Sequence, residues 1–246
     1  MLKKIFITIF FMGLIACNKT EKIEKTYHRN GQLKSITSYK DNKLNGISKL
    51  YYEDGTLQRE VTYINGEQLG PYKYYYSNGN LESEGVVTKR LLWDPLKKYY
   101  QNGAIKLEVI FSENSTENNY TCNIKNYYEN GNLKSEETLV DGWINGEVKN
   151  YYENGQLKSI KNFQNSKLEG VSKFFYENGQ LLFECTYKNG SENGSFRTYY
   201  KNGNLKNEGN FLKGYYEGVY NEYSDTGKLI RKVIYRDKKM TNIENY

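Results

Sequence analysis

The sequence has a single histidine, His28, and only two prolines in 246 residues. His28 occupies a position that is tyrosine in seven other repeats, so we expect it to be a structural strand residue. Histidine-dependent catalytic triads and multi-histidine metal sites are therefore not expected. The Asp and Glu residues fall in turns or in a repeated pattern, so no carboxylate pair stands out for acid–base catalysis. No glycine-rich segment joins a strand to a helix as phosphate-binding loops do. The sequence therefore shows no enzyme signature and indicates neither a cofactor nor a metal.

Apolar residues are also scarce, at 37% of the chain. Globular domains have roughly 45–50% on a scale that also counts glycine, so a large close-packed core is not expected. Aromatic residues nevertheless reach 15%, and 26 of them are tyrosines. Because tyrosine suits a half-buried pleated surface, this composition favours β-strands with one hydrated face.

The one long apolar run lies at the start of the chain and is too short to span a membrane. It follows Lys3 and Lys4, extends over residues 5–15 and ends just before Cys17. A spanning helix needs roughly 20 apolar residues, so residues 1–16 are predicted to be a signal peptide.

The ending Leu14-Ile15-Ala16-Cys17 resembles the lipobox of bacterial lipoproteins. This resemblance implies cleavage before Cys17, lipidation of its sulfur and acylation of the new amino group, and two or more acyl chains give stable anchoring. We expect residues 17–24 to be a lipidated tether and the protein to lie in the bacterial cell envelope. Asn18 rather than aspartate follows the cysteine, which favours the outer membrane or cell surface. The alternative is a plain cleaved signal with a chance cysteine.

A short motif, such as YYENGQLKS at residues 151–159, recurs along the rest of the chain. Its glycines are 24 residues apart, except for a spacing of 28 between Gly103 and Gly131. A second glycine follows fifteen residues later in six repeats. The first set is Gly31, Gly55, Gly79, Gly103, Gly131, Gly155, Gly179, Gly203 and Gly227, and the second is Gly46, Gly70, Gly146, Gly170, Gly194 and Gly218. We expect a turn at each glycine, and so two strands per repeat.

Asn-Gly or Asp-Gly between alternating segments predicts a hairpin with a two-residue type I′ turn. In this register Tyr52 faces Leu57, and the residue six before each glycine faces the residue five after it. Six repeats then carry an opposite-charge pair, namely Lys49–Glu60, Lys73–Glu84, Lys97–Glu108, Lys125–Glu136, Lys173–Glu184 and Arg197–Glu208. The competing geometry, a three-residue turn with a bulge, is expected to shift the pairing by one residue and remove this complementarity.

The same register separates an apolar, aromatic face containing Val61 and Tyr63 from a charged face containing Lys49, Glu60 and a row of tyrosines. A lone hairpin is marginally stable, so each repeat is expected to depend on its neighbours. The predicted fold is all-β, an elongated twisted antiparallel meander of about nine 24-residue β-hairpin repeats and about eighteen strands. The repeats cover residues 25–236, and residues 237–246 are expected to be a C-terminal tail.

The repeat is irregular over residues 86–123, where Asp94 replaces the second glycine and four additional residues lie within residues 112–123. We expect a loop or bulge there and a bend between the flanking repeats. Loops on a regular scaffold often carry function; neutral drift is the alternative. The other two cysteines, Cys122 and Cys185, lie more than two repeats apart. They are too distant for a disulfide and are expected to be free thiols.

The segments YYENGQLKSIKNF and YENGNLKSEETL resemble the MORN-repeat variant family, whose repeats occur in the YwqK-like antitoxin proteins of bacteria. The resemblance spans about residues 25–236. It implies a β-repeat binding module, which in some members neutralises a partner toxin.

We therefore expect a non-catalytic, membrane-anchored lipoprotein whose repeat surface binds a protein or a glycan. The alternatives are an antitoxin or immunity-type protein that neutralises a cognate toxin, and a hydrolase that uses an unrecognised carboxylate pair. The interleaved lysines and tyrosines could stack bases or sugars, but lysines matched by glutamates favour structural packing. Removal of residues 1–16 would lower the net charge from +6 to +4 by taking away two lysines. An excess that small, together with export, indicates no nucleic-acid partner.

Overall fold

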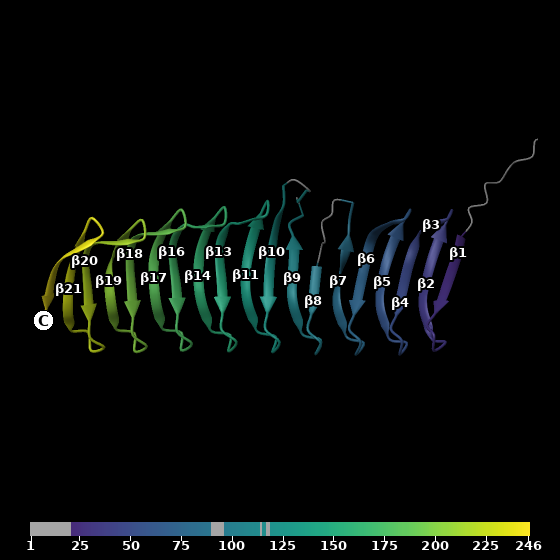
Figure 1. Cartoon of the computed structure of the whole chain (residues 1–246), viewed down its shortest axis with the longest axis horizontal. Coiled ribbons are helices and arrows are strands. Elements are labelled where there is room, and N and C mark those ends of the chain that lie inside the picture. The colour runs from purple at the N-terminus through teal and green to yellow at the C-terminus, as the bar shows by residue number, and fades with distance from the viewer. Residues whose placement is uncertain (1–20, 90–95, 114, 117–118) are drawn as a thin grey trace, which may run out of the picture.

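The computed structural model describes residues 21–89, 96–113, 115–116 and 119–246. These residues contain strands and turns without a helix, and the strands form one antiparallel sheet. Strands adjacent in sequence lie side by side in a single long row, with β1 and β22 at its two ends (Figure 1). The predicted all-β meander of hairpins is confirmed.

The strands are β1 (Glu21–Tyr27), β2 (Leu33–Lys40), β3 (Lys43–Leu44), β4 (Gly46–Tyr51), β5 (Leu57–Ile64), β6 (Glu67–Tyr75), β7 (Leu81–Val87), β8 (Leu96–Tyr99), β9 (Ile105–Phe111), β10 (Thr121–Tyr127), β11 (Leu133–Val140), β12 (Trp143–Ile144), β13 (Gly146–Tyr151), β14 (Leu157–Gln164), β15 (Lys167–Leu168), β16 (Gly170–Phe175), β17 (Leu181–Lys188), β18 (Ser191–Tyr199), β19 (Leu205–Leu212), β20 (Tyr215–Tyr223), β21 (Leu229–Arg236) and β22 (Lys239–Asn245). The described residues thus hold more strand segments than predicted, partly because β3, β12 and β15 are two-residue pieces set off by a bulge.

The first set of glycines closes tight turns, but these are not the predicted type I′ turns. All nine glycines have φ between +83° and +90°, whereas the residue before each has a negative φ. After β4, the Gly55 N–H donates to the Tyr52 carbonyl and the Tyr52 N–H donates to the Thr56 carbonyl. This is a type I turn followed by a left-handed glycine. The predicted pairing is therefore wrong, and Leu57 faces Tyr51.

A compensating bulge preserves the charge register despite this turn. Beyond the Tyr51–Leu57 pair, Gln58 is an extra residue on the returning strand, so Lys49 again faces Glu60. All six predicted opposite-charge pairs are present. The expectation that a bulged turn would remove the complementarity is wrong, because the shift made by the turn is reversed one residue later.

The second set of glycines marks bulges within the strand path rather than turns. The type I′ turns lie four residues earlier, as at Asn65 and Gly66, which have φ of +54° and +93°. Further along, three residues of β6 centred on Gly70 lie opposite Thr62 alone. Gly70 has φ of +104°, and a Cβ there would lie 3.2 Å from the Thr62 Cβ. The bulge therefore requires glycine.

Bulges bend strands, and the strands here are visibly bowed (Figure 1). Large aromatic residues lie opposite several bulge glycines in the strand register, as in the pairs Gly46–Tyr63, Gly146–Phe163 and Gly194–Phe211. The buried row beside them contains Val61, Tyr72, Val148, Cys185, Phe196 and Val233. We call this side the apolar face and the side with Lys49 and Glu60 the charged face, as the sequence predicted.

Both ends of the repeat array extend further than expected. β22 pairs with β21 along its length, so residues 237–246 form a turn and an edge strand rather than a tail. β1 begins at Glu21, within the segment expected to be a tether.

The sheet continues through the irregular region, because β8 pairs with β9 and β9 with β10. Next to the additional residues, the Ser115 hydroxyl is buried and donates to the Thr121 carbonyl at 3.1 Å. Residues 90–95, 114 and 117–118 lie outside the described residues, as does part of the predicted bend.

Candidate functional site

The charged face carries a row of alternating charges that runs across the repeats. Each interior glutamate of the row lies between cations on the two neighbouring strands. The row therefore connects adjacent repeats as well as the two strands of each hairpin. The sequence predicts only the pairs within hairpins. The first part comprises Lys49, Glu60, Lys73, Glu84, Lys97, Glu108, Lys125, Glu136 and Lys149. The second comprises Lys173, Glu184, Arg197 and Glu208. We call this row the charge ladder.

Ion pairs and tyrosine hydroxyls engage the ladder carboxylates. Lys97 Nζ lies 3.1 Å from Glu108, and the Tyr127 hydroxyl donates to the same carboxylate at 2.8 Å. The Tyr127 and Lys97 hydrogen bonds lower the pKa of Glu108. Burial, with the hydrogen bond to a glutamate, raises the pKa of Tyr99 and of Tyr127 to about 12. The glutamate therefore stays charged and the hydroxyls stay protonated near neutral pH.

The ladder is interrupted at Ile160, which lies between Lys149 and Lys173. The same repeat has Phe175 in the row of tyrosines. Tyr99, Tyr151 and Tyr199 each donate to the glutamate fifteen residues earlier. The residue fifteen before Phe175 is Ile160, so the acid and the hydroxyl are missing together. This joint replacement links the hydroxyl to the carboxylate at this repeat, whereas Tyr51 is retained where Ile36 takes the place of the acid.

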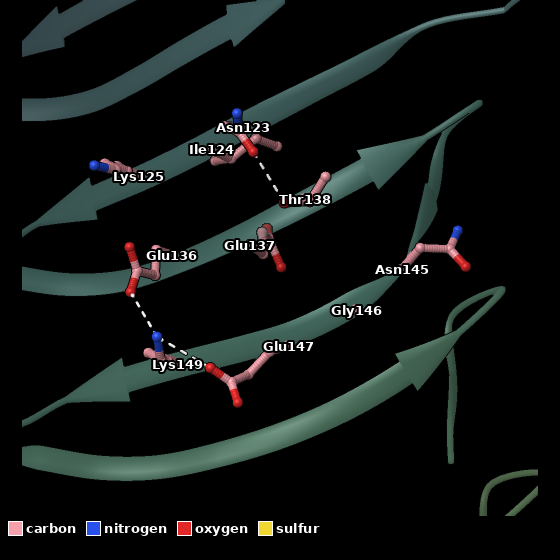
Figure 2. A pocket seen from close by; sticks show the side chains of 10 residues that line it. All are labelled: Asn123, Ile124, Lys125, Glu136, Glu137, Thr138, Asn145, Gly146, Glu147 and Lys149. Carbon is pink, nitrogen blue, oxygen red and sulfur yellow. Dashed lines mark hydrogen bonds and ion pairs between the residues drawn. The ribbon is translucent and has the colours of Figure 1, made fainter. Parts of the chain in front are cut away.

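A shallow depression of about 380 Å³ lies over β10, β11 and β13 (Figure 2). Lys149 spans it, with its Nζ 3.0 Å from Glu147 and 3.7 Å from Glu136. The hydrogen bond to Glu147 raises the pKa of Lys149. Thr138 Oγ1 donates to Asn123 Oδ1 at 2.9 Å. The charged and polar side chains of the depression thus largely satisfy one another, which leaves little to attract a ligand.

The apolar face carries a cluster of rings over β18, β19, β20 and β21, which we call the aromatic platform. Its members are Phe196, Phe211, Tyr216, Tyr220 and Tyr235. Tyr216 is central: its ring is stacked on Phe211 at a centroid distance of 4.7 Å and lies 5.2 Å to 5.5 Å from the other three rings. Tyr216 nevertheless keeps 38% of its surface exposed. An exposed ring held by four others is a preorganised contact surface.

The glycine beneath the platform leaves no space for a side chain. Gly209 lies under the ring of Phe196, and a Cβ there would come within 2.9 Å of it. Beside the platform, Thr198 and Asn207 face each other across β18 and β19. Thr198 Oγ1 and Asn207 Oδ1 are buried and lack a hydrogen-bond partner among the described residues. Water or ligand hydroxyls commonly satisfy such atoms.

The sequence alone does not predict the platform. Its five aromatic residues belong to four different strands. Phe196 and Tyr220 are one 24-residue repeat apart, as are Phe211 and Tyr235, but this spacing does not show that the rings meet around Tyr216.

The remaining predicted site residues show no catalytic grouping. Cys17, the predicted lipidation site, lies outside the described residues. Cys122 and Cys185 are free and buried, and burial raises the pKa of both thiols, that of Cys185 to about 11. The His28 Nε2 lies 3.0 Å from the Tyr51 carbonyl, where other repeats place a tyrosine hydroxyl. Among the described residues, no three His, Cys, Asp or Glu side chains are grouped to bind a metal.

Residues 21–89, 96–113, 115–116 and 119–246 include no helix that is long and apolar enough to cross a membrane.

The family described as MORN repeat variant matches eight segments that together make up more than half of the chain. They are residues 20–41, 44–65, 68–87, 123–141, 144–165, 168–189, 192–213 and 216–237. The longest unmatched internal stretch, residues 88–122, includes most of the irregular segment. Comparison with curated proteins gave no match.

Two of the solved structures that the chain matches both have low TM-scores. The crystal structure of TcdB2-TccC3-TEV is 13% identical with a TM-score of 0.19, over 87% of this chain and 14% of that chain. A porin-like protein from Bacteroides uniformis is 10% identical with a TM-score of 0.21, over 92% of this chain and 96% of that chain. The chain therefore spans only 14% of the length of TcdB2-TccC3-TEV.

Proposed function

Because the chain belongs to the MORN repeat variant family, we propose that it is a non-catalytic interaction module whose aromatic platform binds a protein or a glycan. The observation that carries this proposal is the environment of Tyr216, which packs against four rings and remains 38% exposed. Aromatic rings offer a large, rigid contact area at low cost in conformational entropy.

The charge ladder supports this assignment because its charged side chains are bound by other side chains of the same sheet. Its carboxylates receive lysine, arginine and tyrosine donors, as Glu208 does from Arg197 and Tyr223. Engaged glutamates of this kind are poor candidates for the carboxylate pair of a hydrolase, because such a pair must contact substrate. Matched lysines are likewise poor phosphate ligands, which argues against nucleic acid.

We propose further that Cys17 anchors this module to the bacterial cell envelope, with the outer membrane or cell surface favoured. The support is the sequence of residues 1–17, in which a basic start and a short apolar run precede Leu14-Ile15-Ala16-Cys17. The anchor would hold the partner surface at a membrane. The alternative role is neutralisation of a cognate toxin, which the family resemblance suggests.

The anchor is tested by labelling cells with a clickable palmitate, followed by membrane fractionation of the wild type and of Cys17→Ala. We expect the label and the membrane association of the wild type to disappear together in the variant. An unlabelled, cytoplasmic wild type would refute the anchor and favour the antitoxin role, which co-expression with a toxin encoded by a neighbouring gene would then test.

A further inference from the structure

β1 is the open edge at the N-terminal end of the sheet, and its charges are self-complementary. Residues 21–25 read Glu-Lys-Ile-Glu-Lys. Among the described strands β1 pairs with β2 alone, so its other side presents backbone groups that a further strand could bind. We propose that this edge pairs antiparallel with the same edge of a second copy, about a two-fold axis at Ile23.

The register about this axis follows from the sequence. Glu21 faces Lys25 of the second copy, Lys22 faces Glu24, and Ile23 faces its own equivalent. Symmetry doubles the charged contacts to four opposite-charge pairs. A two-fold axis perpendicular to the sheet also places the charged face of one copy beside the charged face of the other. Directly opposed side chains are about 4.5–5.5 Å apart at Cβ, within reach of these contacts.

The end of the charged row supplies a second, independent observation. Lys25 faces Ile36, and Ile36 faces Lys49, so the described residues place no carboxylate opposite Lys25. The second copy would supply its Glu21 there. Glu21 already lies 3.5 Å from Lys40 on the β2 side. Pairing would therefore place it between two cations, as the interior ladder glutamates are placed.

The exposure of Ile23 fits the same arrangement. Its side chain is 66% exposed and would be covered by the second Ile23. Within one copy Lys22 already contacts Glu24, and the second copy would add a further partner to each. The opposite edge of the sheet offers fewer such pairs, because β22 has a single acid, Glu244, and a single lysine, Lys239.

The contact is expected to be weak, because two seven-residue strands bury less than the roughly 1,200 Å² of stable interfaces. Cysteine crosslinking detects such contacts. In the proposed register, two copies of residue 23 have Cα atoms about 4.5–5.5 Å apart, within disulfide range. Two copies of residue 25 would be more than about 10 Å apart.

The test compares Ile23→Cys with Lys25→Cys in the full chain, purified in mild detergent and oxidised at several protein concentrations. The parent protein gives the background from its native cysteines. We expect Ile23→Cys to form a disulfide-linked dimer about tenfold faster than Lys25→Cys, with a rate that rises with concentration. Equal rates for the two variants would overturn the proposal.

A charge exchange tests the register itself. Adding Glu21→Lys to Ile23→Cys should slow dimer formation about five- to tenfold, because two opposite-charge pairs become like-charge pairs. Adding Lys25→Glu as well should restore the rate. The proposal would be overturned if Glu21→Lys left the rate of dimer formation unchanged, or if the triple variant still formed the dimer slowly. Thermal unfolding of each variant confirms that these exposed substitutions leave the fold intact.

Discussion

The asparagine that precedes seven of the nine turn glycines shows how one residue can serve two repeats. Asn130 Oδ1 accepts the Asn132 N–H at 2.9 Å, while its Nδ2 donates to the Glu153 carbonyl of the next repeat at 3.1 Å. Asn30, Asn78, Asn102, Asn178 and Asn202 make equivalent bonds to the next repeat. The hydrogen bonds of the side-chain amide therefore explain why asparagine recurs at this position. The predicted type I′ turn would instead have required asparagine for its tolerance of positive φ.

The joint absence of an acid at Ile160 and a hydroxyl at Phe175 predicts that the two positions are coupled. We expect Ile160→Glu and Phe175→Tyr together to be more stable than the sum of the single changes by about 1 kcal/mol, the usual contribution of one hydrogen bond. Chemical denaturation of the four proteins measures this coupling. The native pair Tyr151 and Glu136 provides the matched positive control. Strictly additive effects would show that the tyrosine row does not serve the ladder.

The raised pKa values of Tyr99 and Tyr127, each about 12, predict a loss of stability in alkali. An unfolded tyrosine ionises near pH 10. Because the folded protein holds these protons more tightly, their contribution is complete below about pH 10 and is lost as the pH rises towards 12.

Free energies of unfolding from urea titrations between pH 8 and 11.5 test this effect. Tyr127→Phe should fall less steeply with pH than the wild type, because one such group is gone. Tyr27→Phe, at an exposed position of β1, controls for the loss of a hydroxyl. Parallel curves for the wild type and Tyr127→Phe would contradict the prediction.

At the scale of the element, each regular repeat of the described residues combines two hairpin connections with different chemistry. The first is a bulged type I turn that ends in glycine, and the second is a two-residue type I′ turn such as Asn189-Gly190. The period, the strand pairs and the two faces could be predicted, because alternation and charge pairing report register directly. The turn types could not, because Asn-Gly suits both and a bulge restores the register that would distinguish them.

The bulge glycines differ in how tightly their surroundings constrain them. Gly194 has φ of +123°, and a Cβ there would lie 3.0 Å from the Thr186 Cβ, whereas Gly170 has φ of +81° and open space. We expect Gly194→Ala to cost about 2–4 kcal/mol and Gly170→Ala about 1–2 kcal/mol. Denaturant unfolding of the two variants measures the difference. Equal costs would mean that backbone strain alone, without the contact to Thr186, selects glycine.

At the scale of the molecule, repetition builds one continuous sheet with two unlike faces. The charge ladder joins neighbouring repeats on one face, and the platform rings gather on the other. The sequence predicts the charged face and the opposite-charge pairs within hairpins, because the ladder residues recur at intervals of 24 residues, or 28 across the irregular segment. It predicts neither the links between repeats nor the platform, because Phe196, Phe211 and Tyr216 meet only after turns and bulges bring their strands together.

We propose that the aromatic platform, and not the charge ladder, meets the partner. The most direct measurement replaces Tyr216 with the photo-crosslinking amino acid p-benzoylphenylalanine in one variant and Lys173 in another, followed by irradiation of intact cells. Both positions are exposed, and they lie on opposite faces. We expect a discrete crosslinked product from position 216 and none from position 173. A product from position 173 alone would contradict it.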